Sequence, residues 1–141
     1  MRTVSIFLLI FIASQSISEE ILLFSPSKDF HGCLNCKESN EKSVCNRYGK
    51  FGSVYRAESI WNPNGIGNMH MLGSPFNLSG MGLRLSDTQG YFHGYLSIRE
   101  NIDNKYSKLL QFAWIKNEND YAKVRMAFCS QIELLGQREQ R

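Results

Sequence analysis

Four cysteines constrain the fold of this chain more than any other feature of its sequence. Cys33, Cys36 and Cys45 form a C-x2-C-x8-C cluster, and Cys129 lies 84 positions after the last of them (129 minus 45). In a small chain that leaves the cytosol, an even number of cysteines favours structural disulfides. We therefore predict two disulfides, one within the cluster and one from the cluster to the C-terminal segment.

The sequence leaves the pairing open, because four cysteines allow three connectivities. A bond between Cys33 and Cys36 would close a strained loop, so we rank it last among the local pairs. The alternative to two disulfides is a structural zinc site with four thiolate ligands: Cys33, Cys36, Cys45 and Cys129. The second C-x2-C of a zinc ribbon is missing, however. A thiol–disulfide oxidoreductase would need a helix start at the C-x2-C, and no apolar helical pattern follows Cys36. We predict no cofactor.

The first 18 residues carry the pattern of a secretory signal peptide. Arg2 precedes a short apolar run, and Ser16 and Ser18 are small residues before Glu19. The apolar run is shorter than the ~20 residues of a membrane span. We predict cleavage after Ser18, an exported protein that is periplasmic or secreted, and no transmembrane segment in the mature chain. Residues 19–136 then suit a single domain, followed by a frayed polar tail at 137–141.

Charge and motifs argue against several function classes. The formal net charge is +3 in 141 residues, and the basic residues are spread along the chain. Nucleic-acid binding is not favoured, because it normally needs a clustered basic face. The three histidines lie outside any HExxH pattern, and no G-x-S-x-G elbow or phosphate loop occurs.

A tandem repeat follows the cysteine cluster. Its copies run over residues 46–62 and 62–77, with Ser59 matching Ser74 and Trp61 matching Phe76. Gly52 matches Gly67 after a one-residue deletion. We interpret the repeat as a chain of turns held on a core by periodic aromatic anchors. The remaining rings of the first copy form a possible binding surface: Tyr48, Phe51 and Tyr55.

The segment FHGCLNCKESNEKSVCNRYGKFGSVYRAESIWN, residues 30–62, resembles small secreted bacterial proteins of uncharacterised function. Their pattern runs GCLNC, then CNxYGxYGSxY ending in SIWN, then a second segment ending in SPWN, and later a D-x-x-G-x-F/Y-x-G-Y strand pair. The second copy departs from this pattern, because its YGS tripeptide is gone and Phe76 replaces Trp. The resemblance covers about residues 24–98 and implies an exported domain. Related segments appended to nuclease-like domains suggest a hydrolase accessory as an alternative role.

The remaining patterns predict a small α+β domain, with a short antiparallel sheet, Gly/aromatic-rich loops and a C-terminal helix. Residues 21–24 read as a strand, and residues 83–86 and 92–98 alternate as a hairpin around a turn at 87–90. Gly94 suggests a bulge in the second hairpin strand. Residues 109–115 favour a strand. A helix capped by Asn119 or Asp120 is expected to stop at Gly136.

Two functions agree with these features. The first is an exported, non-enzymatic and monomeric binding module with an unknown protein or glycan partner. The alternative is an envelope hydrolase or nuclease-accessory domain. It predicts that His31, His93 or Asp87 converge in one cleft. The patterns themselves favour a turn role for Asp87 and a rim or core position for His93.

Overall fold

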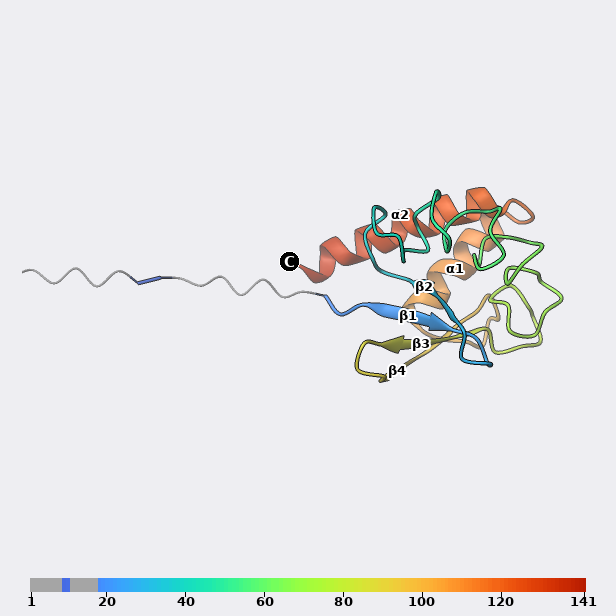
Figure 1. The fold of residues 1–141 in the computed structure, drawn as a ribbon, viewed down its shortest axis with the longest axis horizontal. Coiled ribbons are helices and arrows are strands. Elements are labelled where there is room, and N and C mark those ends of the chain that lie inside the picture. Colours follow the sequence, from blue (N-terminus) through green and yellow to red (C-terminus); the bar gives the residue numbers. More distant parts are fainter. Residues whose placement is uncertain (1–8, 11–17) are drawn as a thin grey trace, which may run out of the picture.

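The computed structural model describes residues 9–10 and 18–141. The predicted signal peptide therefore lies almost wholly outside the described residues. Four strands, β1 (Ile21–Phe24), β2 (Phe30–Cys33), β3 (Leu83–Asp87) and β4 (Phe92–Leu96), precede two helices, α1 (Lys105–Lys116) and α2 (Tyr121–Glu139). The strands form one antiparallel sheet in the order β2-β1-β3-β4, with both helices on one side of it (Figure 1). The α+β class predicted from the sequence is confirmed.

The sheet has one buried and one open face. Alternate residues such as Leu23, Leu85 and Leu96 join a single core with Leu110 of α1 and Phe128 of α2. Their neighbours along the strands point away from this core, as the period of two requires. The predicted hairpin is present, with its turn at residues 88–91. The register shifts by one residue near Gly94, whose φ is +92°, so the predicted bulge is confirmed.

The strand predicted at residues 109–115 is wrong, because this segment lies in α1. Asn104 caps the helix by accepting a hydrogen bond from the Ser107 backbone N–H at 2.9 Å. The buried residues recur at helical spacing: Tyr106, Ser107, Leu110, Gln111 and Ala113. Phe112, which favoured a strand, is exposed to solvent. The aromatic residues of this segment suggested a strand, but the N-cap and the helical spacing of the buried residues produce a helix.

Helix α2 begins as predicted and ends later. The Asp120 side chain accepts a hydrogen bond from the Lys123 backbone N–H at 3.1 Å, which confirms the N-cap. The helix passes through Gly136 and ends at Glu139, so the predicted stop is wrong and the expected frayed tail shortens accordingly. The carboxylate of Glu139 forms an ion pair with Lys105 of α1, which holds the last turn in place.

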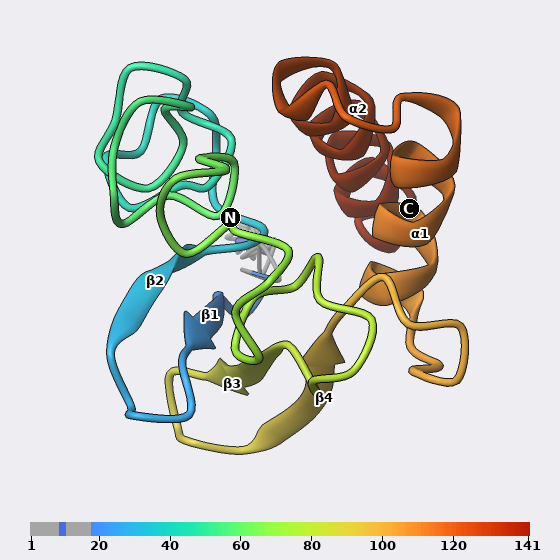
Figure 2. The same cartoon turned by 90° about the vertical axis from the view of Figure 1, so that its right-hand side faces the viewer.

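Residues 40–77 form a structure that we call the turn coil (Figure 2). At each corner the backbone N–H donates to the carbonyl of the preceding corner, usually three residues earlier. The corners are Asn40, Ser43, Asn46, Gly49, Ser53, Arg56, Ser59, Asn62, Gly65, Asn68, Met71, Ser74 and Asn77. Asn46 and Asn62 are separated by five turns, as are Asn62 and Asn77. The step from Gly49 to Ser53 has four residues and contains the extra residue of the first copy.

Polar side chains hold these corners. A Ser or Asn side-chain oxygen accepts a hydrogen bond from the backbone N–H two residues on, for example Ser59 from Trp61 at 3.1 Å and Ser74 from Phe76 at 3.1 Å. Such Asx and Ser/Thr turns satisfy backbone groups that a helix or sheet would otherwise pair. The Ser-x-x-Asn unit at 59–62 and 74–77 also occurs at 43–46, as a third copy that the sequence analysis missed.

Equivalent positions of the three copies meet α2. Cys45 is bonded to Cys129. The Trp61 ring lies 5.7 Å from that of Phe128, and the Phe76 ring lies 4.9 Å from that of Tyr121. Along the same helix, the Tyr121 hydroxyl donates to the Gly67 carbonyl at 2.8 Å, and Arg125 donates to the matching Gly52 carbonyl at 2.9 Å. Helix α2 therefore contacts all three Ser-x-x-Asn units.

Both predicted disulfides are present, and their pairing corrects one expectation. Cys45 pairs with Cys129, as the long-range link requires. The local pair is Cys33–Cys36, which we had ranked last. The intervening loop makes this pair possible, because the Asn35 side chain accepts from the Ile21 backbone N–H at 2.7 Å and donates to the Glu19 carbonyl at 2.8 Å. These bonds fold the loop back on the start of β1.

Candidate binding surfaces

The larger of two candidate sites is a groove on the open face of the sheet, with a volume of about 960 Å³. Its floor is a row of three side chains on adjacent strands. Phe24 of β1 is in register with Arg84 of β3, which is in register with Tyr95 of β4. Because these residues alternate with the core residues, they project from the face opposite the helices. We call this site the sheet-face groove.

Two loops form the walls of the sheet-face groove. One is the β1–β2 turn with Pro26 and Lys28, and the other runs from the end of the turn coil into β3 with Met81. Leu72, which is 69% exposed, and Met81, which is 48% exposed, supply apolar surface. The second wall lies close to the coil, since a Cβ on Gly80 would stand 1.8 Å from the Leu72 carbonyl oxygen.

The described lining of the sheet-face groove carries positive charge. Lys28 and Arg84 line it, and no carboxylate does. The ion pairs found among the described residues involve neither of these two side chains. The Arg84 guanidinium lies 4.4 Å from the centre of the Phe92 ring. A weakly hydrated, planar cation therefore sits beside apolar surface.

A smaller cleft of about 490 Å³ separates the turn coil from the start of α2. Its lining is rich in carboxamides and rings: Val54, Tyr55, Asn62, Pro63, Asn64, Asn119, Asp120, Tyr121 and Ala122. Tyr55 is 87% exposed at its rim. The Asp120 carboxylate, the charged group in this lining, already accepts a hydrogen bond as the N-cap of α2. The polar character of the cleft therefore comes mainly from its carboxamides. We call it the coil–helix cleft.

The predicted three-ring surface of Tyr48, Phe51 and Tyr55 does not form. Tyr48 is 83% exposed and Tyr55 also faces solvent, whereas Phe51 is only 9% exposed. The Phe51 ring packs edge-on against Phe30 of β2, with the ring centres 5.1 Å apart. Phe51 therefore anchors the turn coil to the sheet, and only Tyr55 contributes to a cleft.

The predicted convergence of His31, His93 and Asp87 is incomplete. The Nε2 of His93 lies 2.8 Å from the Asp87 carboxylate, which also accepts from the backbone N–H groups of Gln89 and Tyr91. The hydrogen bond from His93 holds the pKa of Asp87 below its ordinary value, helped by the two backbone donors and partly opposed by burial.

His31 lies on β2 at the far edge of the sheet, where its ring bonds the Glu58 carbonyl at 3.2 Å. Of the three residues, His93 and Asp87 are therefore in contact and His31 is apart from them, and none of the three lines the sheet-face groove or the coil–helix cleft. Asp87 has the turn role predicted from its position, since its carboxylate holds the hairpin turn together.

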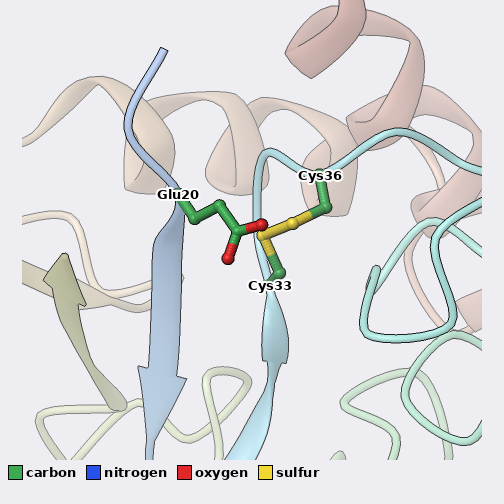
Figure 3. A group of neighbouring side chains, drawn as sticks. All are labelled: Glu20, Cys33 and Cys36. Atoms are coloured by element: carbon green, nitrogen blue, oxygen red, sulfur yellow. A yellow bond between two sulfur atoms is a disulfide. The ribbon is translucent and has the colours of Figure 1, made fainter. Parts of the chain in front are cut away.

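The disulfide Cys33–Cys36 lies beside a carboxylate (Figure 3). An oxygen of Glu20 and the two sulfurs all lie within 4.8 Å of one another, and Lys42 bonds Glu20 at 3.1 Å. The zinc alternative with four cysteine ligands is not borne out, because all four thiols are used in disulfides. The residues after Cys36 form turns rather than the helix whose N-terminus would activate a thiol. This local structure does not support the oxidoreductase alternative.

Sequence reasoning missed the sheet-face groove for a physical reason. Arg84 and Tyr95 face each other across the predicted hairpin, but Phe24 lies far from both in the chain, and only the register of β1 on β3 brings it into the same row. One signal in the sequence could have indicated the groove. A strand with alternating burial that carries Phe or Tyr at its outward positions predicts an apolar outer face of the sheet. Comparison with known proteins adds no assignment: no family model, curated protein or solved structure gives a significant match to this chain.

Proposed function

We propose that this chain is an exported, non-enzymatic binding module whose ligand occupies the sheet-face groove. One observation carries the proposal: the sheet leaves an aromatic face open, and this face forms the floor of a groove of about 960 Å³. Small-molecule sites are concave, mostly apolar and furnished with a few polar groups. The row of Phe24, Arg84 and Tyr95 has this composition.

Export is part of the same proposal. Disulfides persist in oxidising compartments and are rare in the cytosol, and this fold closes two of them. Within the described residues, none of the helices has the length and apolar character needed to cross a membrane. The N-terminal pattern of Arg2, an apolar run and Ser18 supports secretion through a cleaved signal.

The test is a binding screen by two-dimensional NMR on the mature chain from Glu19, with a panel of single-chain amphiphiles, oligosaccharides and short peptides. We expect at least one compound class to shift the amide signals of Phe24, Arg84 and Tyr95 together. A Leu72→Glu variant, which places a charge on the wall, should weaken that binding. Shifts confined to the coil–helix cleft, or no shifts with any class, would refute the proposal.

A second candidate function rests on the coil–helix cleft. Carboxamide side chains and tyrosine rings, here Asn62, Asn64, Tyr55 and Tyr121, supply the hydrogen bonds and stacking surfaces that a neutral glycan uses. The oligosaccharides of the same screen test this role. Binding there should be lost in Tyr55→Ala and unchanged in Tyr48→Ala, which removes an equally exposed ring outside the cleft.

A further inference from the structure

The lining of the sheet-face groove narrows the class of ligand. Leu72 and Met81 present flexible aliphatic surface, and Phe24 and Tyr95 present rings. None of the described lining residues has a carboxamide or carboxylate side chain. A sugar needs several such acceptors for its hydroxyls, whereas an alkyl chain needs none. Apolar contact with an alkyl chain therefore matches this groove better than a glycan does.

The positive charge of the sheet-face groove indicates what head group the ligand carries. The Arg84 Cζ lies 4.4 Å over the centre of the Phe92 ring, and the N–H groups of a guanidinium point outward in its own plane. Neither Arg84 nor Lys28 has an acidic partner among the described ion pairs. A carboxylate or phosphate accepts such N–H groups in charge-assisted hydrogen bonds, which are stronger than neutral ones.

A third cation stiffens the wall. Arg99 donates from Nη1 to the carbonyl oxygens of Ser79 and Gly80, each at 3.2 Å, and approaches the Met81 sulfur at 3.8 Å. Its Nη1 is thus used to hold the loop that carries Met81, and Arg99 is not among the residues that line the groove. Arg84 and Lys28 are left as the two cations available to a ligand, one at the floor and one in the β1–β2 turn.

We propose that the sheet-face groove binds a single-chain amphiphile with an anionic head group. Its alkyl chain lies along Phe24, Leu72 and Met81, and its carboxylate or phosphate is held by Arg84 and Lys28. This inference rests on the proposed function, since it assigns a ligand class to the same groove. Carboxylate and phosphate share the relevant chemistry, so fatty acids and phospholipid-derived amphiphiles are separate arms of the test.

The test uses four probes below their micelle concentrations: dodecanoate, dodecyl phosphate, dodecanol and dodecyltrimethylammonium. Each has a 12-carbon chain, although dodecanoate counts its carboxyl carbon and therefore has one apolar methylene fewer. This difference works against dodecanoate, so tighter binding of dodecanoate than of dodecanol still reports the head group. We expect the two anions to bind at least about 10-fold more tightly than the alcohol or the cation, because one charge-assisted hydrogen bond is strong enough to give that difference in affinity. The ratio of dodecanoate to dodecyl phosphate identifies the preferred source. Binding only to vesicles of an anionic phospholipid, with no response to monomeric anions, would overturn the inference.

Matched variants locate the contact. Arg84→Gln and Lys28→Gln should each weaken dodecanoate binding, and the double variant should lose at least about 10-fold and with it most head-group discrimination. Lys116→Gln removes an exposed cation on α1, far from the sheet-face groove in the chain, and should change nothing. Urea midpoints verify that these variants remain folded.

The outcomes separate the two proposals. Equal affinity for the anionic and cationic probes, or full binding by the double variant, refutes the anionic head group while leaving the groove as a binding site. Shifts of Phe24, Arg84 and Tyr95 with peptides or oligosaccharides but with no amphiphile refute the ligand class alone. If no compound perturbs these residues, the proposed function and this inference fail together.

Discussion

The sheet and the turn coil solve the same problem, the pairing of buried backbone groups, in different ways. In the sheet, residues far apart in sequence pair along ladders, as Leu23 does with Leu85. In the turn coil, partners are usually three residues apart and the side chains of Ser and Asn complete the network. The sheet therefore depends on its topology, whereas the coil depends on local chemistry and on anchors that hold it in place.

This difference explains where the open surface lies. The turn coil uses its equivalent positions, Cys45, Trp61 and Phe76, to attach to α2. The sheet uses one face for the core and leaves the other open. Anchoring should therefore control the stability of the coil, while substitutions on the open face of the sheet should affect binding with little effect on folding.

The largest expected effect concerns the covalent anchor. Replacing Cys45 and Cys129 by Ala removes a link across 84 positions, which in the chain-entropy account costs about 4.5 kcal/mol of the free energy of unfolding. The matched double variant at Cys33 and Cys36 opens a loop of separation 3 and should cost about 2 kcal/mol. Urea unfolding of both measures the contrast. Equal losses would show that loop length does not govern these bonds.

The aromatic anchor comes next. Trp61→Ala should cost about 3–5 kcal/mol, because it empties a fully buried site. Trp61→Phe keeps a ring but leaves the Val44 carbonyl, now bonded by the indole N–H at 2.6 Å, without this donor, and should cost about 1–3 kcal/mol. Denaturant midpoints give both values. A loss below about 1 kcal/mol for Trp61→Ala would mean that the ring does not anchor the coil.

A pair of glycine substitutions compares the coil with an exposed helix. A Cβ on Gly67 would stand 2.3 Å from the Ile60 carbonyl oxygen and 2.6 Å from that of Asn62, so Gly67→Ala should destabilise by about 1–3 kcal/mol. Gly136 in α2 has open space around it, and Gly136→Ala should stabilise by about 0.5–1 kcal/mol. Thermal unfolding reports the signs. Two effects of the same sign would contradict the close approach in the coil.

The smallest expected effect is a pH dependence at the hairpin. The folded-state pKa of Asp87 lies below its ordinary value, chiefly because of the bond with His93. Its stabilisation is therefore fully present above the unfolded pKa of about 3.9 and is lost as pH falls through the folded value. The stability difference between the wild type and His93→Gln should shrink as pH falls from about 5 to 2. A difference that grows with acid would reverse this assignment.

Local signals in the sequence were sufficient for several elements and failed for others. The Asp120 cap, the Asp87 turn and the Gly94 bulge were predicted, because each depends on a few neighbouring residues. Helix α1 was mistaken for a strand, because Phe112 and Trp114 favoured a strand and the cap at Asn104 was not considered. Strand β2 gave no usable pattern, because its FHGC sequence lacks apolar alternation. It pairs with β1 and, at Cys33, bridges to Ser43 of the turn coil.

The candidate site was less accessible to prediction than the fold. The three rings singled out in the repeat were separated by burial, with Phe51 taken into the contact with Phe30. The third Ser-x-x-Asn copy at 43–46 was present in the sequence, but Cys45 stands where the other copies carry a ring, which hid it. The side chains of the sheet-face groove shared no motif at all.

The sequence by itself determined the parts of this protein that rest on short-range chemistry. Cysteine number predicted two disulfides, the Gly, Ser and Asn spacing predicted a repeated turn structure, and alternation predicted the hairpin. Only the tertiary structure decided the pairing Cys33–Cys36 and Cys45–Cys129 and the row of Phe24, Arg84 and Tyr95. The reason is physical: pairings and surfaces of this kind depend on the register of distant segments, and register is set by the packing of the whole core.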